Sequence, residues 1–446
     1  MILDVINLLL LASISWAQPD YQIEGLYALY NNTNGTGWNW KSNNSGIAWN
    51  FTDQNYSKPC NNYEPDQWQG VTCNFSDTGN VTLNNITKIE LKLHGLDGEI
   101  PSGIQLISTL HTLDLESNKL RGTLPDSIAN MTALKTLELP GNDIILPLPY
   151  LGTTIQHLSI SENQLSGTFP TILGKSPQLT KVQLFRNKFP GPFPDVLANL
   201  TLLRNLELGD CNLTGTIPSY LGSLPFSKID VIGNSLTGTV PSTFGKLSGM
   251  EVMWLSLNQL TGTFPSTILS MTAMKYLSLG NNMLNGNLPQ DIGSLQFMLQ
   301  FIMDLNSFTG TIPSGLCALS NVKIVGLSGN SFSGTIPTNI GDMSSDLIML
   351  NMGDNSLSGT IPVSLFNGKS RDLKILTLSS NMLGGTFPDL VEPGMKISLL
   401  DIGTNFIPGP IPLSIMKLHH LTGLQLKENQ FYGSIPAALC QLSLFD

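Results

Sequence analysis

Histidines, cysteines and carboxylates are the side chains of this sequence that could bind a metal ion or perform acid–base catalysis. The histidines are His94, His111, His157, His419 and His420, and none lies in a His-Glu-x-x-His or comparable ligand spacing. The sequence contains no Gly-x-Ser-x-Gly nucleophile elbow and no Gly-x-x-x-x-Gly-Lys-Ser/Thr phosphate-binding loop. We therefore expect a protein that is not an enzyme and that uses neither a metal ion nor another cofactor.

The composition is that of a folded chain without a surface for nucleic acid. Of the 446 residues, 41% are apolar and 12% are charged, so the chain can form a core and is not a disordered one. The 22 basic and 32 acidic residues give a formal charge of -10, and no lysine- and arginine-rich block occurs. Because phosphate recognition needs a concentrated basic surface, nucleic acid is excluded as the expected partner.

Residues 1–17 have the features of a secretory signal peptide. An apolar run from Val5 to Ile14 precedes the small residues Ser15 and Ala17, which predicts cleavage before Gln18. No later apolar run reaches the roughly 18 to 20 residues that cross a bilayer, so we expect no membrane span in this chain. We predict a secreted or cell-surface protein, with a membrane-anchored form as the alternative if the chain is truncated.

Asn-x-Ser/Thr sequons support an extracellular location, because this motif accepts N-linked glycans in secreted proteins. Most of them lie before the repeats described below, and none follows Asn212. The expected glycosylation sites are Asn31, Asn34, Asn43, Asn50, Asn55, Asn74, Asn80, Asn85, Asn130, Asn199 and Asn212.

From Ile86 onward the sequence repeats with a period close to 24 residues. Aligned on Leu-x-x-Leu-x-Leu-x-x-Asn-x-Leu-x-Gly, it contains about fifteen copies, which begin at residues 86, 110, 134, 155, 179, 203, 226, 250, 274, 298, 322, 347, 373, 397 and 421. The alternating apolar and variable positions predict one short strand per copy, and stacked copies place these strands in a parallel sheet. Other spacings must be accommodated in loops, because a residue lost within a strand would turn its side chains over.

The ninth position of nearly every copy is asparagine, whose amide can both donate and accept hydrogen bonds. A stacked column of these amides can satisfy the backbone groups that are left unpaired where the chain turns inward. The column consists of Asn118, Asn142, Asn163, Asn187, Asn234, Asn258, Asn282, Asn306, Asn330, Asn355, Asn381, Asn405 and Asn429, with His94 and Cys211 in the remaining copies. A closing Gly-x-Ile/Leu/Phe/Val-Pro segment predicts a second extended stretch that ends at the proline.

These copies resemble the plant-type leucine-rich-repeat family, whose unit is L-x-x-L-x-L-x-x-N-x-L-x-G-x-I-P. The segments Gly262-Thr263-Phe264-Pro265 and Gly310-Thr311-Ile312-Pro313 match the part that distinguishes this subclass. The resemblance implies an α/β leucine-rich-repeat solenoid over residues 86–446. This would be a right-handed, curved superhelix with a parallel sheet on the concave side and short second strands and helical turns elsewhere. The family's concave side binds partners, and its members include receptor ectodomains, receptor-like proteins and inhibitors of cell-wall-degrading glycosidases.

Residues 18–85 precede the repeats, and we expect them to form an N-terminal helical cap. A stripe of Ile23, Leu26, Tyr27 and Tyr30 predicts a short helix. The segment Trp68-Gln69-Gly70-Val71-Thr72-Cys73 resembles the cap of the same family. A solenoid needs such a cap, because its first coil otherwise exposes its core and an unpaired strand edge.

Five cysteines occur in the sequence. In a secreted chain, Cys60 and Cys73 are expected to form a disulfide within the cap. The other three are Cys211, in the asparagine column, and Cys317 and Cys440, in a column where other copies have Ala129, Ala198, Gly222, Gly245, Gly293 and Gly341. We expect these to be compact apolar fillers rather than reactive or metal-binding thiols.

The variable strand positions should face solvent, and in copies eight to ten they carry large apolar side chains. Trp254 is the only tryptophan of the repeat region. Clustered apolar residues on an exposed face are typical of a binding surface, where tryptophan and tyrosine are favoured. The candidate partner-binding residues are Trp254, Leu257, Tyr276, Ile302 and Leu305, with Phe185 and Arg186 of copy five as an extension.

We therefore predict an extracellular recognition module that binds a peptide, protein or glycan on its concave face, in cell-surface signalling or defence. Two alternatives stay open. A secreted inhibitor of cell-wall-degrading glycosidases would need only the solenoid. Threonine pairs such as Thr237-Gly238-Thr239 and Thr261-Gly262-Thr263 would stack into a flat array, which resembles the surface of ice-binding solenoids.

Overall fold

The computed structural model describes residues 21–40, 46–51, 59–60, 68–76, 83–437 and 439. The chain divides into two compact units, which are described separately. Unit 1 consists of Met1–Phe189 and Val196–Leu203, and unit 2 of Pro190–Asp195 and Arg204–Asp446. The predicted signal peptide lies outside the described residues. No helix within the described ranges is long and apolar enough to cross a bilayer.

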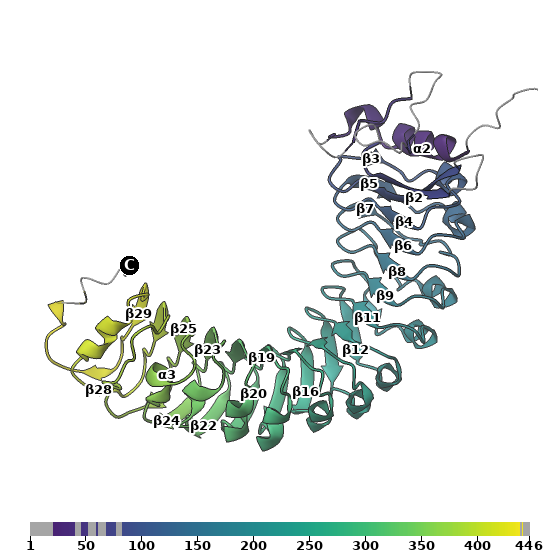
Figure 1. Ribbon diagram of the computed structural model, residues 1–446. Helices are drawn as coiled ribbons and strands as arrows, with labels where there is room; N and C mark the ends of the chain where they lie inside the picture. The colour runs from purple at the N-terminus through teal and green to yellow at the C-terminus, as the bar shows by residue number, and fades with distance from the viewer. Residues whose placement is uncertain are drawn as a thin grey trace, which may run out of the picture. The chain divides into compact units, whose positions relative to one another are not determined.

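Each copy contributes one short strand to a parallel sheet, which we call the long sheet (Figure 1). In unit 1, β1 pairs antiparallel with β2, and the following strands pair in parallel. The strands of unit 1 are β1 (Val71–Ser76), β2 (Leu83–Glu90), β4 (Thr112–Asp114), β6 (Thr136–Glu138), β8 (His157–Ser159) and β9 (Lys181–Gln183). Those of unit 2 are β11 (Asn205–Glu207), β13 (Lys228–Asp230), β15 (Val252–Trp254), β17 (Tyr276–Ser278), β19 (Gln300–Ile302), β21 (Ile324–Gly326), β23 (Met349–Asn351), β25 (Ile375–Thr377), β27 (Leu399–Asp401) and β29 (Gly423–Gln425).

The middle residue of each long-sheet strand points into the coil. Leu113, Leu137 and Val182 are completely buried, as are Met253 and Leu277 in unit 2. The residues on either side of them are directed to the other face of the sheet, because side chains alternate along a strand. The predicted leucine-rich-repeat solenoid with a long parallel sheet is confirmed.

The closing segments form a second set of short strands. In unit 1 they are β3 (Asp97–Gly98), β5 (Lys119–Gly122) and β7 (Asp143–Ile144). In unit 2 they are β10 (Gly191–Pro192), β12 (Leu213–Thr216), β14 (Ser235–Gly238), β16 (Gln259–Thr263), β18 (Met283–Gly286), β20 (Ser307–Thr311), β22 (Ser331–Thr335), β24 (Ser356–Gly359) and β26 (Met382–Leu383), with β28 (Pro408–Gly409) pairing with β30 (Gln430–Phe431).

A short helical turn usually follows the closing proline, whose carbonyl accepts the first hydrogen bond of the turn. In one example Ile128 N donates to Pro125 O over 3.1 Å, and the Ile128 side chain is buried. These 3-10 helices are η2 (Ser102–Leu106), η3 (Asp126–Asn130), η4 (Thr171–Lys175), η5 (Asp195–Asn199), η6 (Ser219–Ser223), η7 (Ser242–Lys246), η8 (Ser266–Ser270), η9 (Gln290–Ser294), η10 (Ser314–Ala318), η11 (Ile340–Asp342) and η12 (Leu413–Lys417).

Copies of unusual length differ in this turn and keep their strands. The copy that begins at residue 134 is the shortest and has no helical turn between β7 and β8. The longest, beginning at residue 347, contains the single α-helical turn α3 (Ser364–Asn367) instead of a 3-10 helix. The strands β23 and β25 that flank α3 still pair residue by residue. Length variation is therefore accommodated outside the long sheet, as the alternation of side chains requires.

The N-terminal end of unit 1 is covered by the helix α2 (Tyr21–Asn32) and the short 3-10 helix η1 (Gly35–Gly37). The helix is confirmed, with Leu26 and Leu29 completely buried, but Tyr27 is 51% exposed. The apolar stripe predicted that Tyr27 would lie on the packed side of the helix. The helix instead packs through Gly25, Leu26 and Leu29, and Tyr27 faces away. Nearby, Trp49 and Trp68 stack with their ring centroids 5.5 Å apart.

A disulfide joins Cys60 and Cys73, which are separated by 13 residues. We expect the double substitution of both cysteines by serine to destabilise the cap by about 3 kcal/mol, because the open chain regains the entropy of an unclosed loop. Near-UV circular dichroism of the cap tryptophans during heating measures this loss. The Cys317→Ala variant, which removes a cysteine outside the cap that forms no disulfide, controls for cysteine replacement as such. An unchanged melting midpoint of the double variant would contradict the prediction.

Candidate ligand-binding face

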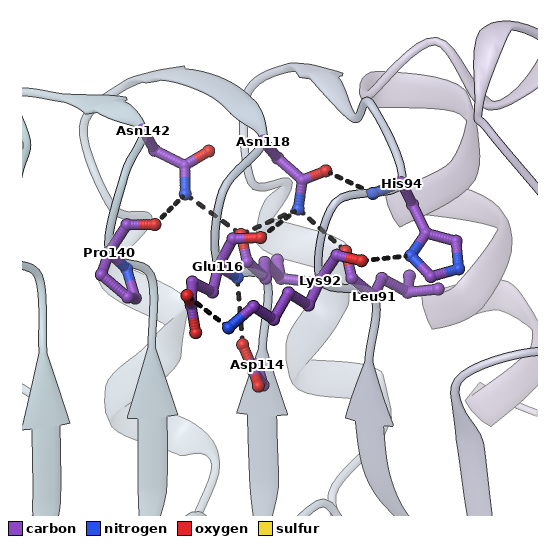
Figure 2. A network of polar contacts seen from close by, with 9 residues as sticks. Leu91, Lys92, His94, Asp114, Glu116, Asn118, Pro140 and Asn142 are labelled. Carbon is purple, nitrogen blue, oxygen red and sulfur yellow. Dashed lines mark hydrogen bonds and ion pairs between the residues drawn. The ribbon is translucent and has the colours of Figure 1, made fainter. Parts of the chain in front are cut away.

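The asparagine column binds each coil to the one before it. Asn118 Nδ2 donates to Leu91 O over 2.8 Å and to Leu115 O over 2.9 Å. Its Oδ1 accepts hydrogen bonds from the backbone N–H groups of His94 and Leu96, both over 3.1 Å. Figure 2 shows this arrangement together with Asn142, which repeats it one coil further on. The predicted role of the column is confirmed, since each amide satisfies backbone groups of two successive coils.

His94 and Cys211 occupy the same column and satisfy local carbonyls instead. His94 Nδ1 lies 2.8 Å from Lys92 O, and the buried Cys211 Sγ lies 3.4 Å from Gly209 O. The Cys211 backbone N–H still donates to Asn234 of the next coil. Cys317 is partly buried, and this burial raises the pKa of its thiol to about 11, which disfavours the reactive thiolate. Cys440 lies outside the described residues.

The residue before each column position adopts a left-handed backbone conformation. Gly233 and Gly329, with φ of 69° and 61°, suit this conformation, since glycine has no Cβ. Leu257 and Leu305 adopt it as well, with φ of 57° and 54°, although a bulky side chain is disfavoured there. Their side chains are 49% and 56% exposed. Unit 1 has one similar case, Leu93, with φ of 59°. Apolar side chains in a disfavoured conformation and in contact with solvent suggest a role beyond folding.

Trp254 lies at the end of β15 on the outer face of the long sheet, and its side chain is partly exposed. Lys228 Nζ lies 4.8 Å from the centroid of the indole ring, which is a cation–π contact. Lys228 also forms an ion pair with Glu207 over 3.0 Å, with only 22% and 9% of the two side chains exposed. The Glu207–Lys228 pair therefore holds a cation against the Trp254 ring.

A buried carboxylate accompanies this cluster. Asp230 is 8% exposed and accepts a hydrogen bond from Ile232 N over 3.2 Å. Burial is the main cause that raises the pKa of Asp230, and the backbone hydrogen bond and Lys228 oppose it. The strand β13, which begins at Lys228 and ends at Asp230, thus places a cation and a carboxylate beside Trp254.

The register of the strands brings Tyr276 and Ile302 to the same face as Trp254. Trp254 is paired with Ser278 and Ser278 with Ile302, so these three form one column across β15, β17 and β19. Tyr276 lies in the neighbouring column, opposite Val252. Five of the predicted residues, Trp254, Leu257, Tyr276, Ile302 and Leu305, therefore occupy consecutive coils of unit 2, and none is buried.

The neighbouring column is an extension that the sequence analysis missed. It contains partly exposed apolar side chains in successive strands, all on the face of Trp254: Val252, Tyr276, Ile324, Met349, Ile375 and Leu399, interrupted by Gln300. The sequence contains the signal, because in unit 1 the same position holds polar residues such as Lys88, Thr112 and Lys181. We call this set of residues, together with Trp254, Ile302, Leu257 and Leu305, the apolar face.

A polar group lies within the apolar face. Asp304 Oδ1 accepts hydrogen bonds from Ser328 N over 2.8 Å and from Ser328 Oγ over 2.7 Å. Asn351 Nδ2 donates to Ser328 Oγ over 2.9 Å. A Cβ on Gly326 would collide with Asp304 Oδ2, so this oxygen lies directly over a glycine of the next strand.

Phe185 and Arg186, the predicted extension of the binding residues, belong to unit 1, whereas the apolar face belongs to unit 2. Phe185 is partly exposed, and Arg186 has the left-handed conformation of its position, with φ of 53°. Arg186 Nη1 pairs with Glu162 Oε1 over 2.9 Å, and both side chains are well exposed. An exposed pair of this kind contributes little to stability, so Arg186 can exchange its partner at small cost.

The threonine array of the second strands is explained by contacts within the solenoid. A Cβ built on Gly238 would lie 2.9 Å from Thr216 Cγ2, so the threonine methyl covers the glycine of the following coil. Thr239 and Gly262 repeat this contact. Hydroxyls of the array also donate within the chain, as Thr237 Oγ1 does to Gly215 O over 3.2 Å.

The predicted glycosylation sites differ in how the structure places them. Asn130 and Asn199 are exposed at the ends of η3 and η5, and Asn212 is exposed before β12. Asn43, Asn55 and Asn80 lie outside the described residues. Among the residues that are described, no group of three or more His, Cys, Asp or Glu side chains could hold a metal ion.

Family comparison identifies the repeats directly. The Leucine Rich Repeat family model matches residues 109–131, 154–176, 202–224, 273–295 and 321–343. With the fold described above, these matches identify leucine-rich repeats in the chain. Over 69 residues it is 38% identical to receptor-like protein 54 of Arabidopsis thaliana, in a match that covers 16% of this chain and 8% of that protein.

Solved structures of plant receptor ectodomains share the fold. The ectodomain of the Arabidopsis thaliana membrane receptor kinase GASSHO1/SCHENGEN3, in complex with Casparian strip integrity factor 2, is 29% identical with a TM-score of 0.66. That match covers 76% of this chain and 44% of the ectodomain. The Arabidopsis receptor kinase HAESA, in complex with an extended IDA peptide hormone, is 27% identical with a TM-score of 0.69. It matches over 86% of this chain and 72% of the HAESA chain. The chain thus spans less than half of the first ectodomain.

Proposed function

We propose that this chain is an extracellular, non-enzymatic recognition module that binds a peptide or an extended protein segment on the apolar face of unit 2. The sequons and the predicted signal peptide support an extracellular location. The similarity to the HAESA ectodomain, which was solved with a peptide hormone, supports a peptide as the partner. Cell-surface signalling or defence is the role that fits these features.

The observation that carries the proposal is that residues of the apolar face are energetically unfavourable in the unbound chain. Leu257 and Leu305 keep a disfavoured backbone conformation and expose about half of each side chain. Glycine or asparagine would remove both costs, and other coils use them, as with Gly233 and Asn281. A partner that covers the leucines turns the exposure into buried apolar area, which stabilises the complex.

The alternatives differ in how well the described contacts support them. Inhibition of a glycosidase would use the same face with a folded enzyme as the partner, and no contact singles it out. Ice binding is not proposed, because the methyl groups of Thr216 and Thr239 lie over glycines of the following coil and therefore have a role within the solenoid.

Panning a displayed library of random dodecapeptides on the full secreted chain tests the proposal. We expect enriched peptides to lose affinity for the Trp254→Ala variant by about 30-fold or more, the effect of removing a central aromatic contact worth about 2 kcal/mol. Phe297→Ala is the matched control, since Phe297 is 60% exposed but lies in a turn before β19. The proposal fails if no peptide is enriched, or if Trp254→Ala binds the enriched peptides as well as the control does.

A further inference from the structure

Carboxylates lie among the residues of the apolar face, and the outward strand positions around them hold no basic residue. In each coil, the first and last residues of the long-sheet strand and the second residue after the strand face outward. Between Lys228 and Lys427, no lysine or arginine occupies any of these positions. The outward residues of β15 to β27 are Val252, Trp254, Ser256, Tyr276, Ser278, Gly280, Gln300, Ile302, Asp304, Ile324, Gly326, Ser328, Met349, Asn351, Gly353, Ile375, Thr377, Ser379, Leu399, Asp401 and Gly403. The exposed Asp354 lies in the column of Leu257 and Leu305, and the charged members of this set are Asp304 and Asp401.

These two carboxylates differ in how far the chain satisfies them. Asp401 Oδ1 accepts from Gly403 N over 3.1 Å, and its Oδ2 accepts from Ser379 Oγ over 2.8 Å. Asp304 receives its hydrogen bonds on Oδ1, from both the N–H and the hydroxyl of Ser328. Within the described chain, no donor bonds to Asp304 Oδ2. Asp304 therefore presents an open acceptor, whereas Asp401 does not.

The surroundings of Asp304 Oδ2 are apolar on most sides. The oxygen lies over Gly326, which is paired with Ile302 on one side and with Asn351 on the other. Ile324 precedes Gly326 by two residues on the same face, and Leu305 follows Asp304 with its side chain 56% exposed. When a ligand covers this region, water is removed from the carboxylate, and an uncompensated charge becomes costly.

We propose that the peptide bound on the apolar face carries a cationic group, an ammonium or a guanidinium, that pairs with Asp304 Oδ2 and has apolar residues on both sides. This inference rests on the proposed function and names the chemistry of the partner. A cation restores the missing donor at Oδ2, and the outward strand positions of β15 to β27 hold no lysine or arginine that would repel it. Lys228, which contacts the Trp254 ring, is itself paired with Glu207. The formal charge of -10 on the chain also favours the approach of a cationic ligand.

Asp304→Asn isolates the charge, because the asparagine carbonyl can still accept from Ser328. For enriched peptides that contain lysine or arginine, we expect the variant to bind about tenfold to a hundredfold more weakly, the usual range for a charge-assisted hydrogen bond. Peptides with the basic residue changed to glutamine should bind the unchanged protein more weakly by the same factor and lose nothing further with Asp304→Asn. N-acetylated and free peptides distinguish a side chain from the terminal amine as the cation. Asp291→Asn, an exposed carboxylate of η9 outside the face, should bind like the unchanged protein.

The outcomes separate this inference from the proposed function. Enriched peptides that depend on Trp254 but have no basic group, or that bind Asp304→Asn normally, overturn the inference and leave the proposed function standing. An equal loss with Asp291→Asn also overturns it, because the effect would then reflect net charge. If no enriched peptide depends on Trp254, the proposed function fails and the inference fails with it.

Discussion

Replacing Asn187 with alanine is expected to destabilise the surrounding coils of unit 1 by about 3 kcal/mol, because it leaves several buried backbone groups without partners. Asn187 is 2% exposed. Its Nδ2 donates to Ile160 O and to Leu184 O, each over 2.9 Å, and its Oδ1 accepts from Leu165 N over 3.1 Å. Water cannot replace these partners without opening the coil.

Amide hydrogen exchange is the appropriate measurement, since stacked repeats need not unfold in one step. The exchange of the Leu165 amide should become faster by about two orders of magnitude, which corresponds to that loss of free energy. Asn321→Ala is the control. Asn321 is exposed and donates one hydrogen bond, to Gln296 O over 2.7 Å, so its loss should cost less than about 1 kcal/mol. Unchanged protection of Leu165 would refute the structural role of the column.

The second large effect is expected for Gly341→Ala in unit 2. Gly341 is buried within η11, and its N–H donates to Ser364 Oγ over 3.1 Å. An added Cβ would collide with the backbone carbonyl of Ser364 in α3, which cannot move as a flexible side chain could. Overpacking against backbone costs about 3 kcal/mol or more, so the melting midpoint of unit 2 should fall by several degrees.

Gly249→Ala is a control with the same chemical change. No atom lies within 4 Å of a Cβ built on Gly249, so the substitution should leave the melting midpoint unchanged or raise it slightly. Equal midpoints for the two variants would show that α3 and η11 are not packed as closely as described.

The strands and the asparagine column could be predicted from the sequence because both are periodic. A repeated Leu-x-Leu fixes which side chains face the core, and stacking then places Asn118 or Asn142 against the preceding coil. Trp254 was recognised as outward for the same reason. Tyr27 was misplaced because α2 packs against the solenoid through residues that an isolated helix pattern cannot select.

The properties of the candidate site depended on contacts between different coils. The cation beside Trp254 comes from Lys228, which pairs with Glu207, and these two residues lie in the two preceding strands. The open oxygen of Asp304 results from Ser328, one coil later, which bonds to the other oxygen. Neither contact can be predicted from residue type and spacing, because each side chain is long enough or polar enough to bond to other partners as well.

The asparagine column also bears on how such a chain changes length in evolution. Each amide serves its own coil and the preceding one, and each coil receives the same bonds from its successor. Duplication or excision of one whole period therefore leaves every amide with equivalent neighbours. A fractional gain or loss within a strand would break that correspondence, so selection should favour changes by entire modules or changes confined to the turns.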